Sequence, residues 1–331
     1  MQLTQKKRRR GDLLTASAVA VLLAVMAALL YSGSLTRQVT NMLIPTAVYI
    51  VMAVSLNLVV GLLGELSLGH AGFMSVGLFS GCLVAIALAD TALPLAVRLP
   101  VSMLAGGLTA AVFGLLAGLP TLRLRGDYLA IVTLACGEII KNIITNLRVT
   151  GGALGLNTTA IYAGAKELLP YGAALVLLTV AVMLNLKRSK YGRAIMAIRD
   201  NRIAAESVGL NITRYKLAVF VIAAFFAGCA GVLYGHSLAN IKAAAFDYNM
   251  SIEILVIVVL GGMGSVPGSV VSAIVLTVLP EALREVADYR MLVYAVVLIL
   301  VMQATNNPAM QRFFGSVRER LTPVRKERAA L

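Results

Sequence analysis

The sequence predicts an all-α polytopic integral membrane protein with about eight to ten transmembrane helices. Hydrophobic residues make up 59% of the 331-residue chain and charged residues only 13%, and the mean hydropathy is +0.87. Apolar segments long enough to cross a bilayer recur from one end of the chain to the other, and glycine-rich stretches interrupt two of them. These values exclude an ordinary soluble domain and favour a single membrane domain.

The expected spans, in chain order, are Leu13–Tyr31, Asn41–Leu63, His70–Ala89, Leu99–Leu119, Asp127–Leu147, Leu168–Leu186, Tyr215–His236, Ile252–Leu279 and Tyr289–Gln303. The first is longer than the apolar core of a signal peptide, which has about 7–15 residues. No small-residue cleavage site follows it, so we expect it to be retained as a helix. The expected organisation is a basic cytoplasmic N-terminus at 1–12, a transmembrane domain at 13–311 that contains a polar loop at 187–216, and a basic cytoplasmic tail at 312–331.

The formal net charge of +14 is compatible with nucleic-acid binding, but the placement of the basic residues favours a membrane explanation. Most of the 29 Lys and Arg residues adjoin apolar segments, in the clusters Lys6–Arg10, Arg123 with Arg125, Lys187–Lys216 and Arg312–Arg328. The positive-inside rule predicts that these clusters are cytoplasmic. The tail reaches that side only if Ile252–Leu279 turns back at Gly261–Gly268 as a re-entrant pair, which is the interpretation we favour. No nucleic-acid partner is expected.

The segment Lys187–Lys216, the central loop, is the longest polar interval in the chain. Within it, Ala194–Val208 contains neither Pro nor Gly and is predicted to form one short helix that ends at Gly209. The apolar side of this helix would comprise Ile195, Ile198, Ile203 and Val208. A short amphipathic helix between two spans is suited to docking into a groove of another protein. The alternative is a charged loop that only sets the orientation of the protein.

Two glycine-rich breaks lie on opposite sides of the central loop, at Gly61–Phe73 and Leu260–Ser269. Corresponding breaks in two halves of a membrane protein indicate a transporter with internal repeats and a pathway near the midplane of the bilayer. The alternative is that small residues only allow close packing of helices. The candidate residues for a translocation pathway are Gly64, Ser67, Gly69, His70, Gly261, Gly264 and Ser265.

Ionisable residues at membrane depth are costly unless they are paired or wet, and they therefore mark places of interest. Glu65 and His70 lie at the first break, and Glu253 lies near the start of a later span. Glu138 and Lys141 are three residues apart, on one face of a helix, where they can form an ion pair. We interpret them as a structural intramembrane pair; a proton or ion relay is the alternative.

No catalytic or cofactor site is expected. The three cysteines, Cys82, Cys136 and Cys229, are isolated in apolar segments, which indicates neither a disulfide nor a metal site. The chain has no phosphate-binding loop, no zinc-protease motif and no nucleophile with an evident base. A non-enzymatic protein is therefore predicted, with energy coming from a gradient or from a partner.

Four blocks of sequence resemble one known family. They are LNLVVGLLGELSLGHAGF, RLRGDYLAIVTLACGEIIKNIITN followed by TGGALGL, YGRAIMAIRDNRIAAESVGLNITRYKLAVFVIAAFFAGCAGVLYG, and VVLGGMGSVPGSV. Over roughly Leu56 to Arg284 the chain resembles a permease subunit of the branched-chain amino acid ABC importers, the M-type of the two permease subunits. The chain departs from the family at Glu65, where Gln is frequent, after Gly151–Gly152, where Pro is frequent, and at Gly268–Ser269, where Gly-Pro is frequent.

The resemblance implies an ABC importer permease architecture in a bacterial cytoplasmic (inner) membrane. The implied partners are a second homologous permease subunit, two cytoplasmic ABC ATPase subunits and an extracytoplasmic solute-binding protein, in addition to membrane lipid. It implies that the central loop carries the ATPase-coupling helix, and the candidate coupling residues are Ala194, Ile198, Arg199, Arg202, Ala204, Ala205, Glu206 and Gly209. The implied cargo is leucine, isoleucine and valine. Other amino acids, urea or short amides are alternatives, as is an ion-coupled secondary transporter.

Overall fold

The computed structural model describes residues 2–33, 36–89, 91, 93–121, 124, 126–282, 296 and 299. The chain divides into two compact units, Met1–Thr277 and Val278–Leu331, and the first contains nearly all of the described helical residues. Arg123, Arg125, the tail at 312–331 and most of the predicted span Tyr289–Gln303 lie outside the described residues. Predictions about them remain predictions.

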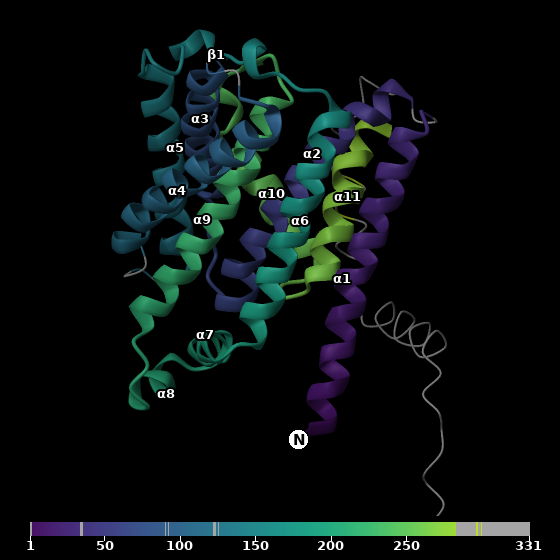
Figure 1. Cartoon of the computed structure of the whole chain (residues 1–331). Coiled ribbons are helices and arrows are strands. Elements are labelled where there is room, and N and C mark those ends of the chain that lie inside the picture. Colours follow the sequence, from purple (N-terminus) through teal and green to yellow (C-terminus); the bar gives the residue numbers. More distant parts are fainter. Residues whose placement is uncertain are drawn as a thin grey trace, which may run out of the picture. The chain divides into compact units, whose positions relative to one another are not determined.

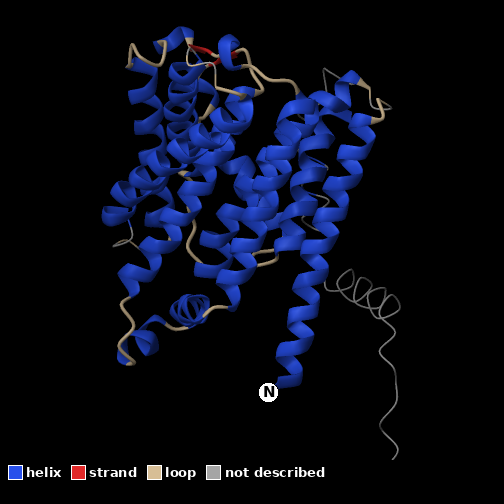
Figure 2. Ribbon diagram, viewed as in Figure 1, coloured by secondary structure: helices blue, strands red, loops and turns tan. Residues whose placement is uncertain are grey.

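The described residues are almost entirely helical, which confirms the predicted all-α class (Figures 1 and 2). The elements are α1 (Gln2–Tyr31), α2 (Arg37–Asn57), the π-helix η1 (Leu58–Leu63), α3 (His70–Ala89), α4 (Leu95–Thr121), α5 (Asp127–Asn146), η2 (Gly152–Leu154), β1 (Leu156–Asn157), η3 (Thr159–Ile161), α6 (Ala165–Arg188), α7 (Lys190–Asp200), α8 (Arg202–Ser207), α9 (Ile212–His236), β2 (Asn240–Ile241), η4 (Ala243–Ala245), α10 (Tyr248–Gly261) and α11 (Val266–Ala282). Strands β1 and β2 form a short antiparallel pair. Within the described part, seven helical segments are long and apolar enough to cross a membrane, and two further apolar helices are shorter.

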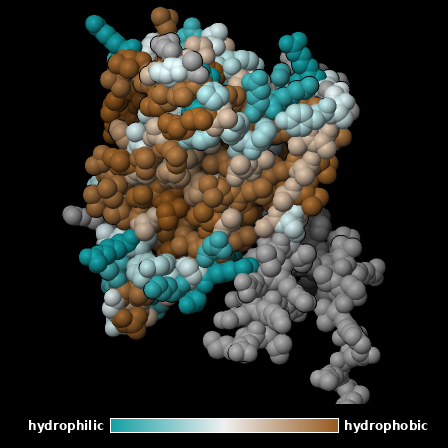
Figure 3. All heavy atoms as spheres, in the orientation of Figure 1, coloured by the Kyte–Doolittle hydropathy of each residue, from teal (hydrophilic) through white to brown (hydrophobic). Residues whose placement is uncertain are grey.

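Helices α3, α4 and α9 pack closely because small residues lie where they cross. A Cβ atom on Gly77 of α3 would lie 2.2 Å from the Cα of Gly228 in α9, and one on Gly106 of α4 would lie 2.4 Å from the carbonyl oxygen of Gly77. Small residues allow the backbones of membrane helices to approach in this way. Figure 3 shows a broad hydrophobic surface over the middle of this bundle, with hydrophilic residues gathered towards its two ends.

The two ends of the bundle can be told apart by the central loop. The Tyr31 hydroxyl at the end of α1 donates to the carbonyl of Lys166 at the start of α6, over 3.1 Å. The two helices are therefore antiparallel, and the first residues of α1 lie on the side where α6 enters the central loop. Figure 1 shows the N-terminus, α7 and α8 at that end, whereas β1 lies at the opposite end. We call these ends the loop side and the far side.

Helices α10 and α11 form a hairpin whose turn, at Gly262–Ser265, lies on the loop side. Gly264 lies against Gly61 near the end of η1, and Ser269 bonds to Asn57 one turn earlier in α2. Helix α11 therefore runs antiparallel to α2, back towards the far side. A hairpin is the geometry that the re-entrant interpretation of Ile252–Leu279 requires. The side on which the tail lies remains a prediction.

The prediction of one helix at Ala194–Val208 is wrong, because the segment is divided between α7 and α8 at Asn201. Asn201 has extended backbone dihedrals (φ −153°, ψ 103°), and its side chain accepts a hydrogen bond from the backbone N–H of Ala204. Asn is a favoured N-cap residue and here starts a second helix. The first helix also begins earlier than predicted, at Gln2 and not at Leu13.

Candidate functional site at the two helix breaks

The two glycine-rich breaks, which are distant in the sequence, meet in the structure. The π-helix η1 ends at Gly64, which has the positive φ of 78°, and α10 ends at Gly261, just before the turn that contains Gly264. A Cβ atom on Gly61 would lie 2.2 Å from the backbone nitrogen of Gly264. The contact therefore depends on glycine at position 61. It joins the end of α2–η1 to the turn of the α10–α11 hairpin.

The side chain of Asn57 fastens this contact. Its amide nitrogen donates to the carbonyl oxygen of Ser265 at 3.2 Å and to the hydroxyl of Ser269 at 2.9 Å. Its amide oxygen accepts from the backbone N–H of Gly264 at 2.7 Å. Asn57 is completely buried, so these partners satisfy polar groups that water cannot reach. One side chain thus makes three of the hydrogen bonds that hold the unwound turn against α2.

Two basic residues of the central loop donate hydrogen bonds to the same breaks. Nη1 of Arg199 bonds to the carbonyl oxygen of Gly61 at 3.0 Å, and Nζ of Lys187 bonds to the carbonyl oxygen of Gly264 at 2.8 Å. The carbonyl of Gly61 lies at the end of η1, where carbonyl groups lack an intrahelical partner and carry partial negative charge that a cation stabilises. The carbonyl of Gly264 lies in the turn between α10 and α11. Asp200 holds the Arg199 guanidinium from its other side, accepting from Nε at 3.0 Å and Nη2 at 2.9 Å.

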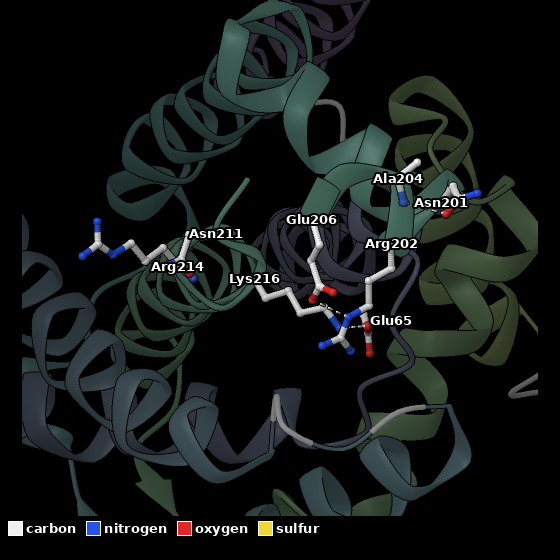
Figure 4. Close-up of polar contacts among 8 residues, drawn as sticks. All are labelled: Glu65, Asn201, Arg202, Ala204, Glu206, Asn211, Arg214 and Lys216. Carbon is white, nitrogen blue, oxygen red and sulfur yellow. Dashed lines mark hydrogen bonds and ion pairs between the residues drawn. The ribbon is translucent and has the colours of Figure 1, made fainter. Parts of the chain in front are cut away.

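A third cation, Lys216 near the start of α9, forms an ion pair with Glu65, which lies within the first break just after Gly64. Figure 4 shows the two side chains pointing toward one another. The Lys216 side chain is only 4% exposed and that of Glu65 16%, and burial of these charges is tolerable because they are paired. Arg202 and Glu206, also drawn in Figure 4, form a separate and more exposed pair within α8 at 3.3 Å. The bond of Lys187 to Gly264 and the pair of Lys216 with Glu65 therefore fix both ends of the central loop to the breaks.

The predicted coupling residues fall into two groups. Ile198 and Ala205 are buried and pack with Ile212 at the start of α9, and Arg199 reaches the first break. The others lie at or near the surface of the loop: Ala194, Arg202, Ala204, Glu206 and Gly209. The predicted apolar side is divided in the same way, because Ile195 and Ile198 are buried whereas Ile203 is 80% and Val208 75% exposed. The division follows from the break at Asn201, which turns α8 out of line with α7.

The candidate pathway residues are also divided. Gly264 and Ser265 lie at the contact between the breaks, and Gly261 packs on Gly268 across the hairpin. Gly64 is exposed, and Arg199 lies against one side of it, since a Cβ atom on Gly64 would lie 2.5 Å from Cγ of Arg199.

The remaining three pathway candidates lie along the connection to α3. Ser67 is buried, and Gly69 packs against the backbone of Thr133 in α5. Nε2 of His70 lies 2.8 Å from the hydroxyl oxygen of Ser55 in α2.

Glu138 and Lys141 form an ion pair on α5. Glu138 also accepts a hydrogen bond from the backbone N–H of Tyr248 at 2.9 Å, where α10 begins. A carboxylate at a helix N-terminus bonds free N–H groups and is favoured by the helix dipole. The pair therefore joins α5 to the start of the hairpin. Glu253, on α10, accepts from the hydroxyl of Tyr49 on α2 at 3.2 Å.

Sequence reasoning missed Asn57, Lys187 and Lys216 as individual site residues. Asn57 carried a usable signal, because a fully buried amide in an apolar span is costly and needs partners. The two lysines were indistinguishable from the other basic residues that bound the central loop. Among the described residues, no three His, Cys, Asp or Glu side chains are grouped so as to hold a metal ion.

A multi-pass helical protein with two interrupted helices joined to one polar loop has the organisation of a membrane transport permease. Residues 38–302 match the family described as the branched-chain amino acid transport system permease component, and the chain belongs to this family. It is 36% identical over 291 residues to the high-affinity branched-chain amino acid transport system permease protein LivM of Salmonella typhimurium, and equally to that of Escherichia coli.

These two matches cover 78% of this chain and 66% of each relative, so the matched part is just under two thirds of their length. The chain is also 32% identical over 126 residues to the permease protein LivH of Salmonella typhimurium, a match that covers 37% of this chain and 40% of that protein. No solved structure matches the chain.

Proposed function

We propose that this chain is the permease subunit of an ATP-driven importer that moves leucine, isoleucine and valine across the cytoplasmic membrane. The observation that carries the proposal is the family match over residues 38–302, which includes both breaks and the whole central loop. ATP hydrolysis is assigned to separate ATPase subunits, and this chain contributes the pathway and the docking segment.

The surface of α8 supports the docking assignment. Ile203 and Val208 are large apolar side chains exposed on the loop side, and an exposed apolar pair within a charged loop suits a groove in a partner protein. Helix α7 is held to the membrane helices through Ile195, Ile198 and Arg199. The loop therefore combines an anchored half with an exposed half, as a coupling segment requires.

The assembly we propose contains a second homologous permease subunit, two cytoplasmic ABC ATPases and an extracytoplasmic solute-binding protein. The similarity of the chain to both LivM and LivH proteins supports pairing with a homologous permease. We place the loop side in the cytoplasm of a bacterial inner membrane, because the basic start of α1 and the basic central loop lie there. We propose that the tail is on the same side.

For the cargo we propose a pathway along the small residues of the two breaks, where helix ends offer partners for both ends of a zwitterion without full charges. The residues proposed for it are Gly64, Ser67, Gly69, His70, Gly261, Gly264 and Ser265. Glu138 and Lys141 are proposed to be structural. Discrimination among amino acids is assigned mainly to the solute-binding protein, since a permease that binds its cargo tightly cannot release it.

Competition for uptake tests the substrate assignment. Cells that express the complete transporter take up labelled leucine in the presence of an excess of unlabelled valine, urea or glutamate, in separate assays. We expect valine to abolish leucine uptake, and urea and glutamate to leave it unchanged. Cells in which Gly209→Val replaces the native chain supply the background, because a β-branched residue is strained at the φ of 83° found there. Inhibition by urea and not by valine would overturn the branched-chain assignment.

A further inference from the structure

The hydrogen bonds of Lys187 and Arg199 connect the start of the central loop to both glycine-rich breaks. Lys187 lies in the last turn of α6 and Arg199 in the last turn of α7, so the two cations flank the anchored half of the central loop. Their acceptors, the carbonyls of Gly61 and Gly264, belong to the two breaks, which are themselves packed together. The part of the chain from Lys187 to Arg199 therefore bonds to both breaks.

The bond geometry makes the Arg199 part of this bridge sensitive to movement of α7, and the Lys187 part sensitive to movement of the end of α6. Bonds between a cation and a carbonyl weaken steeply when the donor is withdrawn. The neighbouring Asp200 accepts two bonds from the Arg199 guanidinium, which favours a donor that moves with the end of α7. In contrast, the Asn57 bonds lie wholly between the membrane helices and do not involve the loop.

We propose that Arg199 and Lys187 are positioning residues that hold the two breaks together while the central loop is at rest. Displacement of α7 withdraws Arg199 from Gly61, and Lys187 is withdrawn from Gly264 when the adjoining end of α6 follows. Loss of both bonds allows Gly61 and Gly264 to separate, which opens the loop side of the bundle between α2–η1 and the hairpin. We call these two cation–carbonyl bonds the latch. The identity of the partner that displaces α7 rests on the proposed function, whereas the existence of the latch does not.

Thiol labelling of the full-length chain in membrane vesicles tests the latch without substrate or ATPase. Ser67, buried within the first break, is replaced by cysteine in a background in which the three native cysteines are alanine. We expect Arg199→Gln combined with Lys187→Met to raise the rate of maleimide labelling about tenfold, which corresponds to 1.4 kcal/mol of closing free energy. Arg199→Lys combined with Lys187→Met, which keeps one cationic donor group at position 199, should give an intermediate rate.

Two controls make the result specific. Arg193→Gln removes a cation from the same helix, but the bond of Arg193 runs to the carbonyl of Arg188 inside the loop, so the labelling rate should not change. A cysteine at the buried Ser75 of α3 should stay protected in every variant. An unchanged rate at position 67 in the double variant would overturn the proposal, and so would an equal rise at position 75, which indicates general loosening.

A second measurement separates the latch from the proposed function. In the complete transporter, reconstituted in proteoliposomes, the double variant should keep ATP hydrolysis but import several-fold less leucine per ATP hydrolysed than the native protein. If the native transporter shows no ATP-driven leucine import, the proposed function fails while the labelling result still decides the latch. Normal import per ATP in the double variant would overturn the coupling role of the two cations.

Discussion

At the scale of single residues, Asn57 is the side chain on which the junction of the two breaks depends most. Asn57→Ala would remove the acceptor of the Gly264 N–H, and a buried group left unsatisfied costs about 1–3 kcal/mol. It would also remove one of the bonds to the carbonyl of Ser265, which still accepts from Ser269. We expect a clear fall in the melting temperature of the purified protein. Ser269→Ala removes only one of the three bonds and should lower it less. Equal melting temperatures for the native protein and Asn57→Ala would contradict this role.

The sequence predicts which types of residue lie at this junction, but not which residues contact one another. The basic central loop, Glu65 and the glycines of both breaks are evident in the sequence, because they depart from a strongly apolar background. That Lys216 pairs with Glu65, or that Arg199 reaches Gly61, follows from helix packing over long sequence separations. A single sequence carries no pattern for such contacts.

At the scale of elements, the separation of α8 from α7 gives a prediction for docking. Ile203→Glu changes an exposed side chain, so the melting temperature should stay close to that of the native protein. Import should fall about tenfold or more if 1.4 kcal/mol of interface free energy is lost, and a cysteine at Ser207 should no longer crosslink to the ATPase.

Leu154→Glu is a matched control, because it alters an equally exposed apolar residue, 84% exposed, on the far side. Import should be unaffected by that change. Native import by the Ile203→Glu protein would indicate that the loop only orients the chain.

The pair on α5 is expected to serve stability. Replacement of Glu138 by Gln and Lys141 by Met removes the ion pair and weakens the acceptor for the N–H of Tyr248, which should lower the melting temperature. The relative uptake of leucine, valine and glutamate should not change in protein that assembles. A stable double variant with an altered order of preference would place these residues in the substrate site instead.

Helix boundaries show what a sequence pattern can and cannot supply at this scale. The spans were predictable because uninterrupted apolar length is a direct physical requirement of the bilayer. Asn201 was overlooked because Asn is tolerated within helices, and its capping of α8 depends on local backbone geometry. The hairpin of α10 and α11 was predictable only as one of two alternatives, since glycines also serve close packing.

At the scale of the whole molecule, sidedness follows from opposite locations of the connecting segments. A cysteine at Leu154, in the exposed connection on the far side, should react with an impermeant thiol reagent applied to intact cells. A cysteine at Ser207 on the loop side should react only after the cells are opened. The nearby Thr158 is fully buried and is therefore a poorer reporter than Leu154. Labelling of Ser207 in intact cells would reverse the proposed orientation.

The energy source distinguishes the proposed importer from an ion-coupled transporter that uses the same helices. Proteoliposomes that contain this chain, its permease partner, the ATPases and the solute-binding protein are assayed for labelled leucine import with ATP, with and without ionophores that collapse ion gradients. We predict import that requires ATP and is unaffected by the ionophores. Import that proceeds without ATP and is abolished by the ionophores would contradict the assignment.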